Sequence, residues 1–267
     1  MELKKQLSSQ QESQPMNEKQ NYAVLLQYNG KKYHGWQIQP NACSVQETLQ
    51  ICFSNILRQN IQIIGCGRTD TGVHARKYVA NFYAETMTEE QIKRLREKIN
   101  IYLSTDIKIF EIKKVAAEFN ARFDAISRTY KYYIAKIKQP FNNDFSWFYP
   151  AKLDLQQMNI ASSLLYDYND FTSFSKVNTQ VNNFECEIYY AQWEENEDYL
   201  IFTIKANRFL RNMVRCIVGT LIDVGRGKIS IKEFSEIIEA KDRRKAGVSA
   251  EARGLFLEDV EYDNVDF

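Results

Sequence analysis

The sequence predicts an α+β protein with two ferredoxin-like lobes, each built on a mixed or antiparallel sheet with its helices on one face. The chain has 267 residues, which suits two domains of roughly 150 residues or fewer. Its composition, 44% hydrophobic and 26% charged, is that of an ordinary globular protein. The expected elements of the first half run strand, helix, strand, strand, helix, strand, as in a split βαβ sheet.

The chain divides into three parts by composition. Residues 1–20 consist mainly of Gln, Ser, Lys and Glu, which predicts a disordered leader. The pattern changes at Asn21, where apolar runs and turn residues begin to alternate. We therefore expect an N-terminal lobe over residues 21–115 and a C-terminal lobe over residues 116–267.

The elements of the first lobe follow from apolar periodicity, turns and helix caps. In chain order they are a strand at 22–27, a helix from the capping box of Ser44 and Glu47 to about Arg58, strands at 61–66 and 76–84, a helix from the capping box of Thr88 and Gln91 to about Leu103, and a strand at 107–115.

The second lobe repeats this order loosely. In chain order we expect a strand at 130–137, a helix starting at Asp154, strands at 183–193 and 199–206, a long helix from Arg208 with Asn207 as N-cap and Gly225 just after its end, a short helix from the capping box of Ser230 and Glu233, and a strand at 254–262.

Cysteine usage and hydropathy exclude several protein classes. The five cysteines are an odd number and no pair has the spacing of a zinc ribbon or a redox motif. No stretch approaches about 18 uncharged apolar residues, and the N-terminus lacks the apolar core of a signal peptide. We therefore expect a cytoplasmic protein with reduced thiols that has no membrane segment.

The net charge is only +1, but charges are sorted along the chain. Residues 199–222 carry four basic side chains and no acid, and residues 122–138 carry five basic side chains and one acid. Residues 185–198 carry six acids and no Lys or Arg. This pattern fits either a basic face for a polyanion or ordinary solvated faces, and charge alone favours neither.

Three arginines at the start of the expected long helix sharpen this question. Arg208, Arg211 and Arg215 follow one another at three and four residues, so in a helix they would share one face. Three guanidiniums placed in this way suit phosphates or a buried carboxylate.

The most unusual segment is the loop at residues 65–76, with three glycines in its first eight positions. It is not a dinucleotide fingerprint, because Asp70 stands where a third glycine is required, and not a P-loop, because Val73 replaces the lysine. It presents one carboxylate, Asp70, two residues from one guanidinium, Arg68. Asp70 is either the cap of an ordinary turn or a reactive group.

Residues 67–75, Gly-Arg-Thr-Asp-Thr-Gly-Val-His-Ala, resemble the active-site motif of the tRNA pseudouridine synthase A (TruA) family. Five further segments resemble motifs of that family in the same order: Tyr-His-Gly-Trp-Gln at 33–37, Phe-Asn-Ala-Arg-Phe at 119–123, Arg-Thr-Tyr-Lys-Tyr at 128–132, Asp-Phe-Thr-Ser-Phe at 170–174, and Phe-Leu-Arg-Asn-Met-Val-Arg at 209–215. The resemblance extends from about Tyr22 to Tyr262. One departure is residues 246–251, which lack the prolines usual in the family.

The resemblance implies an intramolecular isomerase that converts uridine to pseudouridine at positions 38 to 40 of the tRNA anticodon stem-loop, with no cofactor and no metal. Asp70 would be the catalytic carboxylate, and either attacks C1′ or removes the 2′ proton. The family is dimeric, which implies a homodimer, and the active cleft is expected between the lobes.

The resemblance also implies roles for four arginines and one tyrosine. Arg215 would be the ion-pair partner of Asp70, although a phosphate contact or an exposed charge is the plain alternative. Arg68 would hold the substrate with its target base turned out, and Tyr130 would contact that base, unless it is a core tyrosine. Arg208 and Arg211 are candidate RNA contacts.

Two other function classes compete with this interpretation. The first is a tRNA-binding protein without catalysis. The second is a hydrolase in which Asp70 acts together with His74, although a lone histidine after a glycine turn more often has a structural role.

Overall fold

The computed structural model describes residues 19–176, 183–263 and 265–267. The elements of the first half are β1 (Lys19–Tyr28), α1 (Val45–Leu57), β2 (Ile63–Gly65), β3 (His74–Glu85), α2 (Glu89–Tyr102) and β4 (Ile107–Lys114). Those of the second half are β5 (Ala125–Ala135), β6 (Trp147–Phe148), α3 (Leu155–Ser163), β7 (Ile188–Glu195), β8 (Tyr199–Ala206), α4 (Met213–Gly225), α5 (Ile231–Glu239) and β9 (Leu255–Tyr262).

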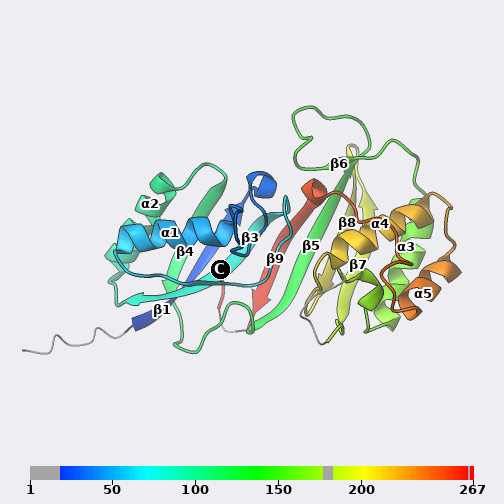
Figure 1. The fold of residues 1–267 in the computed structure, drawn as a ribbon. Helices are drawn as coiled ribbons and strands as arrows, with labels where there is room; N and C mark the ends of the chain where they lie inside the picture. The colour runs from blue at the N-terminus through cyan, green and yellow to red at the C-terminus, as the bar shows by residue number, and fades with distance from the viewer. Residues whose placement is uncertain (1–18, 177–182, 264) are drawn as a thin grey trace, which may run out of the picture.

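All strands of the described residues belong to one sheet, in the order β4-β1-β3-β9-β5-β8-β7, with β2 beside β3 and β6 beside β5. Within each half the main strands pair in antiparallel fashion. The helices α1 and α2 lie with the first half of the sheet and α3, α4 and α5 with the second (Figure 1). The predicted α+β class is therefore confirmed.

The last strand joins the two halves. β9 pairs with β5 along most of its length, and it pairs with β3 in parallel at His74 with Phe256 and at Ala75 with Leu257. Figure 1 shows β9 between β3 and β5, in the middle of the sheet. The C-terminal strand therefore places the loop that precedes β3 next to the second half of the chain.

Helix starts follow the predicted caps. The hydroxyls of Thr88 and Ser230 each take part in a complete capping box, with Gln91 and Glu233 as partners. At Ser44 only one half of the box is present, because the Glu47 N–H donates to the Ser44 hydroxyl at 3.2 Å. These bonds satisfy helix N–H groups that have no partner within the helix.

The predicted start of the long helix is wrong. α4 begins at Met213 rather than at Arg208, because Asn212 adopts a left-handed conformation with φ 66°. The predicted N-cap, Asn207, accepts a hydrogen bond from the Glu187 N–H at 2.9 Å instead of capping α4. Arg208 and Arg211 therefore precede the helix, only Arg215 lies on it, and the three arginines share no helix face.

Further boundaries differ from the prediction. β7 starts at Ile188, five residues later than expected, and the short strand β6 was not expected. β1 starts at Lys19, inside the predicted leader, and residues 1–18 lie outside the described residues. β5 starts at Ala125, five residues early, because its polar side chains have partners: the Ser127 hydroxyl donates to the Glu261 carboxylate at 2.8 Å. Gly225 is the last residue of α4 rather than the residue after it.

A buried amide network fastens the loop between β4 and β5 to the sheet. Asn81 is fully buried, and its side chain donates to the Asn21 side-chain oxygen at 3.1 Å and accepts from the Ala121 N–H at 2.9 Å. Asn21 in turn donates to the Phe119 carbonyl at 2.8 Å. The network fixes residues 119–121, which directly precede Arg122.

We predict that Asn81→Ala lowers the free energy of unfolding by about 3 kcal/mol, because it leaves the Ala121 N–H and the side-chain oxygen of Asn21 buried without a partner. Urea unfolding followed by circular dichroism measures the effect. The control is Asn55→Ala, which removes an exposed amide and is expected to cost less than about 0.5 kcal/mol. Equal losses in the two variants would contradict the proposed importance of the network.

Candidate active site

The loop between β2 and β3 presents Asp70, and hydrogen bonds hold its backbone in place. The Trp36 N–H donates to the Thr69 carbonyl at 3.2 Å, and the Val73 N–H donates to the Asp70 carbonyl at 3.1 Å. The hydroxyls of Tyr28 and Thr69 share a hydrogen bond of 2.8 Å. The residues around Asp70 are therefore fixed, while its side chain faces outward from the turn.

An aromatic layer supports this loop from below. The rings of Trp36 and Tyr78 stack with centroids 4.1 Å apart, and the Tyr78 hydroxyl donates to the Gly67 carbonyl. Gly35 has φ 87°, and a Cβ atom there would lie 2.4 Å from the Thr69 carbonyl oxygen. Trp36 is buried, so its ring packs beneath the loop.

The Asp70 carboxylate faces two guanidiniums from the second half of the chain. Oδ2 lies 3.7 Å from Nη1 of Arg215, and Oδ1 lies 3.9 Å from Nε of Arg211. No hydrogen bond of this carboxylate to a backbone group is found in the described part of the chain, so the side chain does not act as the cap of its own turn. Both ion pairs are longer than hydrogen bonds, which leaves the oxygens available to a ligand.

The segment at 246–251 orients Arg215. Its Nε donates to the Ala250 carbonyl at 2.7 Å, and the Ala250 N–H donates back to the Arg215 carbonyl at 2.9 Å. Asn212, just before α4, donates to the Ser249 hydroxyl at 2.7 Å. This segment lacks the prolines expected in the family, and hydrogen bonds to the start of α4 hold it instead.

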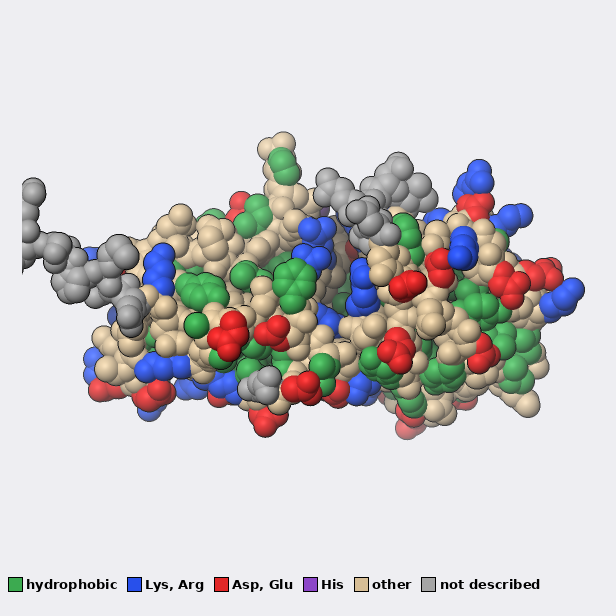
Figure 2. All heavy atoms as spheres, turned by 90° about the horizontal axis from the view of Figure 1, so that it is seen from below, with side chains coloured by type: hydrophobic (Ala, Val, Ile, Leu, Met, Phe, Trp, Pro, Cys, Tyr) green, Lys and Arg blue, Asp and Glu red, His purple; other side chains and the backbone are tan. Residues whose placement is uncertain are grey.

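Arg68, next to this carboxylate, belongs to a group of cations. Its pKa is lowered, first by burial and then by the charges of Arg122 and Arg211. Guanidiniums held close together favour a bound anion between them. Figure 2 shows Lys and Arg side chains around the middle of the molecule, where its two halves meet, and acidic side chains on both halves.

Tyr130 lies on β5 with its ring edge against Phe209, the centroids being 5.1 Å apart and the planes at 87°. Burial raises the pKa of its hydroxyl, and the neighbouring Cys66 and Asp70 act in the same direction, while the charge of Arg128 opposes them. The hydroxyl therefore stays protonated. It has no hydrogen-bond partner among the residues that the structure covers, so it is free to bind a ligand near Asp70.

Arg208 lies apart from Asp70. Its charge acts on the thiol of Cys186, where it opposes the rise in pKa that burial causes. No ion pair of Arg208 is found within the described ranges. Of the three arginines expected to act together, the structure brings only Arg211 and Arg215 to the carboxylate.

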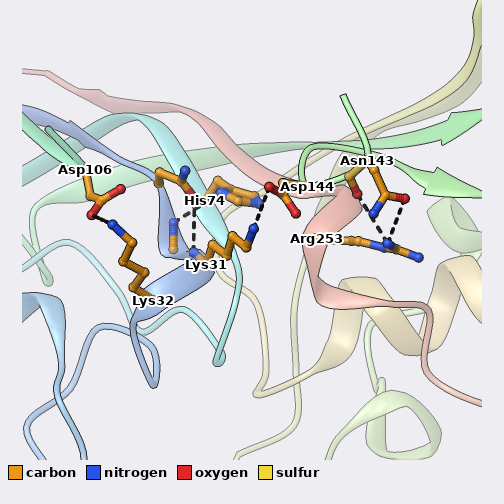
Figure 3. Close-up of polar contacts among 9 residues, drawn as sticks. Lys31, Lys32, His74, Asp106, Asn143, Asp144 and Arg253 are labelled. Carbon is orange, nitrogen blue, oxygen red and sulfur yellow. Dashed lines mark hydrogen bonds and ion pairs between the residues drawn. The ribbon is translucent and has the colours of Figure 1, made fainter. Parts of the chain in front are cut away.

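His74 does not belong to this site. Its ring is buried and stacks on Phe256 with centroids 4.6 Å apart, and its Nδ1 accepts from the Gly30 N–H at 3.1 Å. Figure 3 shows it beside the ion pair of Lys31 and Asp144, at the junction of the two halves. Burial lowers its pKa to about 4. The structural role expected for His74 is what the geometry supports.

The sequence pattern gave no role to Arg122 or Arg128. Arg122 lies close enough to lower the pKa of Arg68, and Arg128 donates hydrogen bonds to backbone carbonyls around the site. Both residues stand in the motifs at 119–123 and 128–132, within the run of residues 122–138 that carries five basic side chains and one acid. Their place in these motifs was the one available signal.

The described residues contain neither a metal-binding cluster nor a helix that could cross a membrane. They contain no group of three or more His, Cys, Asp or Glu side chains arranged to hold a metal ion. None of their helices has the length and hydropathy needed to cross a membrane.

Comparison with known proteins gives consistent similarities. A sequence profile of the family described as tRNA pseudouridine synthase matches residues 24–124 and 164–263. These ranges contain Asp70 and Arg215, whereas Tyr130 lies between them.

Three relatives named tRNA pseudouridine synthase A illustrate the range of sequence identity and coverage. The protein from Bacteroides fragilis is 48% identical over 244 residues, which cover 91% of this chain and 96% of that protein. The protein from Parabacteroides distasonis is 48% identical over 241 residues, covering 90% and 95%. The protein from Thermoanaerobacter pseudethanolicus is 39% identical over 244 residues, covering 91% and 99%.

We predict that His74 makes stability depend on pH. Its pKa is about 4 in the folded chain against about 6.5 when unfolded, so the unfolded chain binds the proton more readily. The neutral, buried His74 therefore adds about 3 kcal/mol to the free energy of unfolding above pH 6.5. This contribution is lost as the pH falls towards 4.

The measurement is urea unfolding of the wild type and of His74→Asn at several pH values, since Asn can accept the Gly30 N–H bond without titrating. The control is His34→Asn at the other, exposed histidine. A wild-type minus His74→Asn difference that stays constant between pH 7 and 4 would rule out the buried neutral histidine.

Proposed function

Because the chain belongs to the tRNA pseudouridine synthase family, we propose that Asp70 is the carboxylate with which it isomerises uridine to pseudouridine in tRNA. The observation that carries the proposal is the position of Asp70, on a rigid loop and facing two guanidiniums. The matched family and the relatives' names make the chain an isomerase that acts on tRNA.

The proposed reaction needs one charged oxygen close to the sugar. The bond between N1 of uracil and C1′ breaks, the base turns, and C5 bonds to C1′. The proton on C5 leaves and N1 gains a proton, so the composition of the nucleotide is unchanged. Asp70 starts the reaction either by attacking C1′ or by removing the 2′ proton, and both routes require the ionised carboxylate.

The surroundings of Asp70 favour this charged form. The guanidiniums of Arg215 and Arg211 lie at 3.7 and 3.9 Å, and an opposite charge at such a distance stabilises an ionised carboxylate. Arg215 is held by Ala250 rather than by Asp70. It therefore keeps its position when Asp70 moves to bond the substrate.

The neighbouring side chains suit a nucleotide turned out of its stem. Tyr130 offers a ring face or a free hydroxyl to the base, and base stacking on aromatic rings contributes about 1 to 3 kcal/mol. Arg68, Arg122 and Arg211 form a cationic group that suits the flanking phosphates. We propose Tyr130 and Arg68 as substrate-binding residues and Arg208 and Arg211 as further RNA contacts.

We also propose the finer features that the family implies. When the short strand β6 is set aside, the first strand of each half lies between the fourth and the third, as in a ferredoxin-like sheet, which supports two such lobes meeting at an active cleft. The lobe boundary at residues 115 and 116 falls between β4 and β5. We further propose that the chain acts at positions 38 to 40 of the anticodon stem-loop, that it forms a homodimer and that it is cytoplasmic.

The two alternative functions are weaker. A hydrolase would need His74 as a base, but this ring is buried at the junction of the halves and is stacked on Phe256. A tRNA-binding protein without catalysis would not need a carboxylate among cations, because that carboxylate repels phosphate. Release of free uracil, with His74→Ala as harmful as a change at Asp70, would favour the hydrolase.

We predict that Asp70→Asn abolishes pseudouridine formation, by at least about 1,000-fold, while tRNA binding changes by less than about threefold, since the change removes charge but not shape. Pseudouridine mapping in transcribed tRNA and a filter-binding assay measure the two effects. Asp144→Asn, at an ion pair away from the site, is the matched control. Retained modification in Asp70→Asn would remove Asp70 from the mechanism, and loss of activity with a chelator would contradict the metal-free reaction.

We predict that Arg208→Ala weakens tRNA binding and lowers the slope of log K against log salt concentration by about 1, as expected for one lost phosphate contact. The rate at saturating tRNA should change by less than about twofold. The control is Arg94→Ala on the exposed surface of α2, which removes the same charge and should leave the slope unchanged. Identical slopes for both variants would exclude Arg208 from the RNA interface.

A further inference from the structure

Arg128 has no role in the site described so far. It lies near the start of β5, two residues before Tyr130, and its side chain is half-buried. Its backbone lies between two neighbours in the sheet, Ala206 of β8 and Val260 of β9. The side chain therefore extends from a strand that is paired on both sides in the sheet.

The guanidinium of Arg128 donates four hydrogen bonds, all to backbone carbonyls. Nη1 bonds Ala125 at 2.7 Å and Asn207 at 2.8 Å. Nη2 bonds Cys66 at 3.0 Å and Arg122 at 2.6 Å. These carbonyls come from three places in the chain, at residues 66, 122–125 and 207, separated by up to 141 positions.

Three of the four carbonyls belong to segments that carry the site. Cys66 lies just before the loop that presents Asp70. Arg122 belongs to the turn whose cation acts on Arg68. Asn207 opens the irregular segment that holds Arg211 before α4. One side chain thus connects the carboxylate loop of the first half with the cationic segment of the second.

Only a guanidinium can make these bonds. Its donors lie in one plane at fixed angles, so two pairs of carbonyls are bonded at once, whereas an ammonium group has three donors in a compact arrangement. No carboxylate pairs with Arg128 in the described ranges. The side chain is therefore held by backbone carbonyl dipoles alone.

We propose that Arg128 is a positioning residue for the reaction, which keeps the Asp70 loop, the Arg122 turn and the Arg211 segment at fixed separations through four hydrogen bonds. The proposal rests on the function proposed above. A direct RNA contact is the competing role, but both terminal nitrogens of Arg128 are already bonded to carbonyls.

The test compares Arg128→Lys and Arg128→Gln with the wild-type chain, at temperatures well below each variant's own midpoint of unfolding. A shift of about 1 Å between reacting groups costs about 100-fold in rate. We expect the rate at saturating tRNA to fall about 100-fold in both variants, because both lose the planar fork. The dissociation constant for tRNA should change by less than about threefold.

The matched control is Lys131→Met on the same strand, where a cation without an ion pair among the described residues is removed. It should keep the wild-type rate within about twofold. If wild type and control form no pseudouridine, the proposed function fails. If they form it while both Arg128 variants also keep their rate within about threefold, only the positioning role fails.

Salt dependence separates positioning from RNA contact. A positioning residue leaves the slope of log K against log salt concentration unchanged, whereas a phosphate contact at Arg128 lowers it by about 1 in Arg128→Gln, which removes the charge. The lower slope would overturn the proposal. The proposal would also be overturned if Arg128→Lys kept the wild-type rate while Arg128→Gln were slow, because a positive charge alone would then be enough for a normal rate. Variants unfolded at every temperature would assign Arg128 to folding instead.

Discussion

The candidate site depends on one constraint: the carboxylate comes from the first half of the chain, and the guanidiniums that face it come from the second. Asp70 lies 3.7 Å from Arg215 and 3.9 Å from Arg211 only while the halves keep a fixed relation. β9 supplies that relation, because it pairs with β3 on one side and with β5 on the other. The loop that carries Asp70 precedes β3, and Tyr130 lies on β5.

The same constraint explains why so many backbone carbonyls near the site are bonded by side chains. Irregular segments have no ladder to fix them, so side-chain donors take over this task. Tyr78 holds Gly67, Arg128 holds Cys66 and Asn207, and Arg215 is held by Ala250. The residues 246–251 take part through hydrogen bonds instead of the prolines expected in the family. Rigidity thus comes from donors placed on strands and on α4.

Charge near the site differs from the average of the chain. The net charge of +1 conceals a local group of cations, in which Arg122 and Arg211 lower the pKa of Arg68. Like charges held together destabilise the free protein and bind a polyanion more strongly. His74, by contrast, is kept neutral by burial at the junction of the halves, which lowers its pKa, so it contributes no charge to the cationic group at neutral pH.

The sequence by itself determined the order of the elements, the helix caps at Thr88 and Ser230, and the family, because these depend on local periodicity, on contacts three residues apart and on motifs of a few residues. It also singled out Asp70, Arg215 and Tyr130. Only the tertiary structure decided that α4 starts at Met213, that Arg211 reaches Asp70 while Arg208 does not, and that Arg128 connects distant segments. The physical reason is that partners far apart in the chain, such as Glu187 for Asn207 and Ser249 for Asn212, override the local helix pattern.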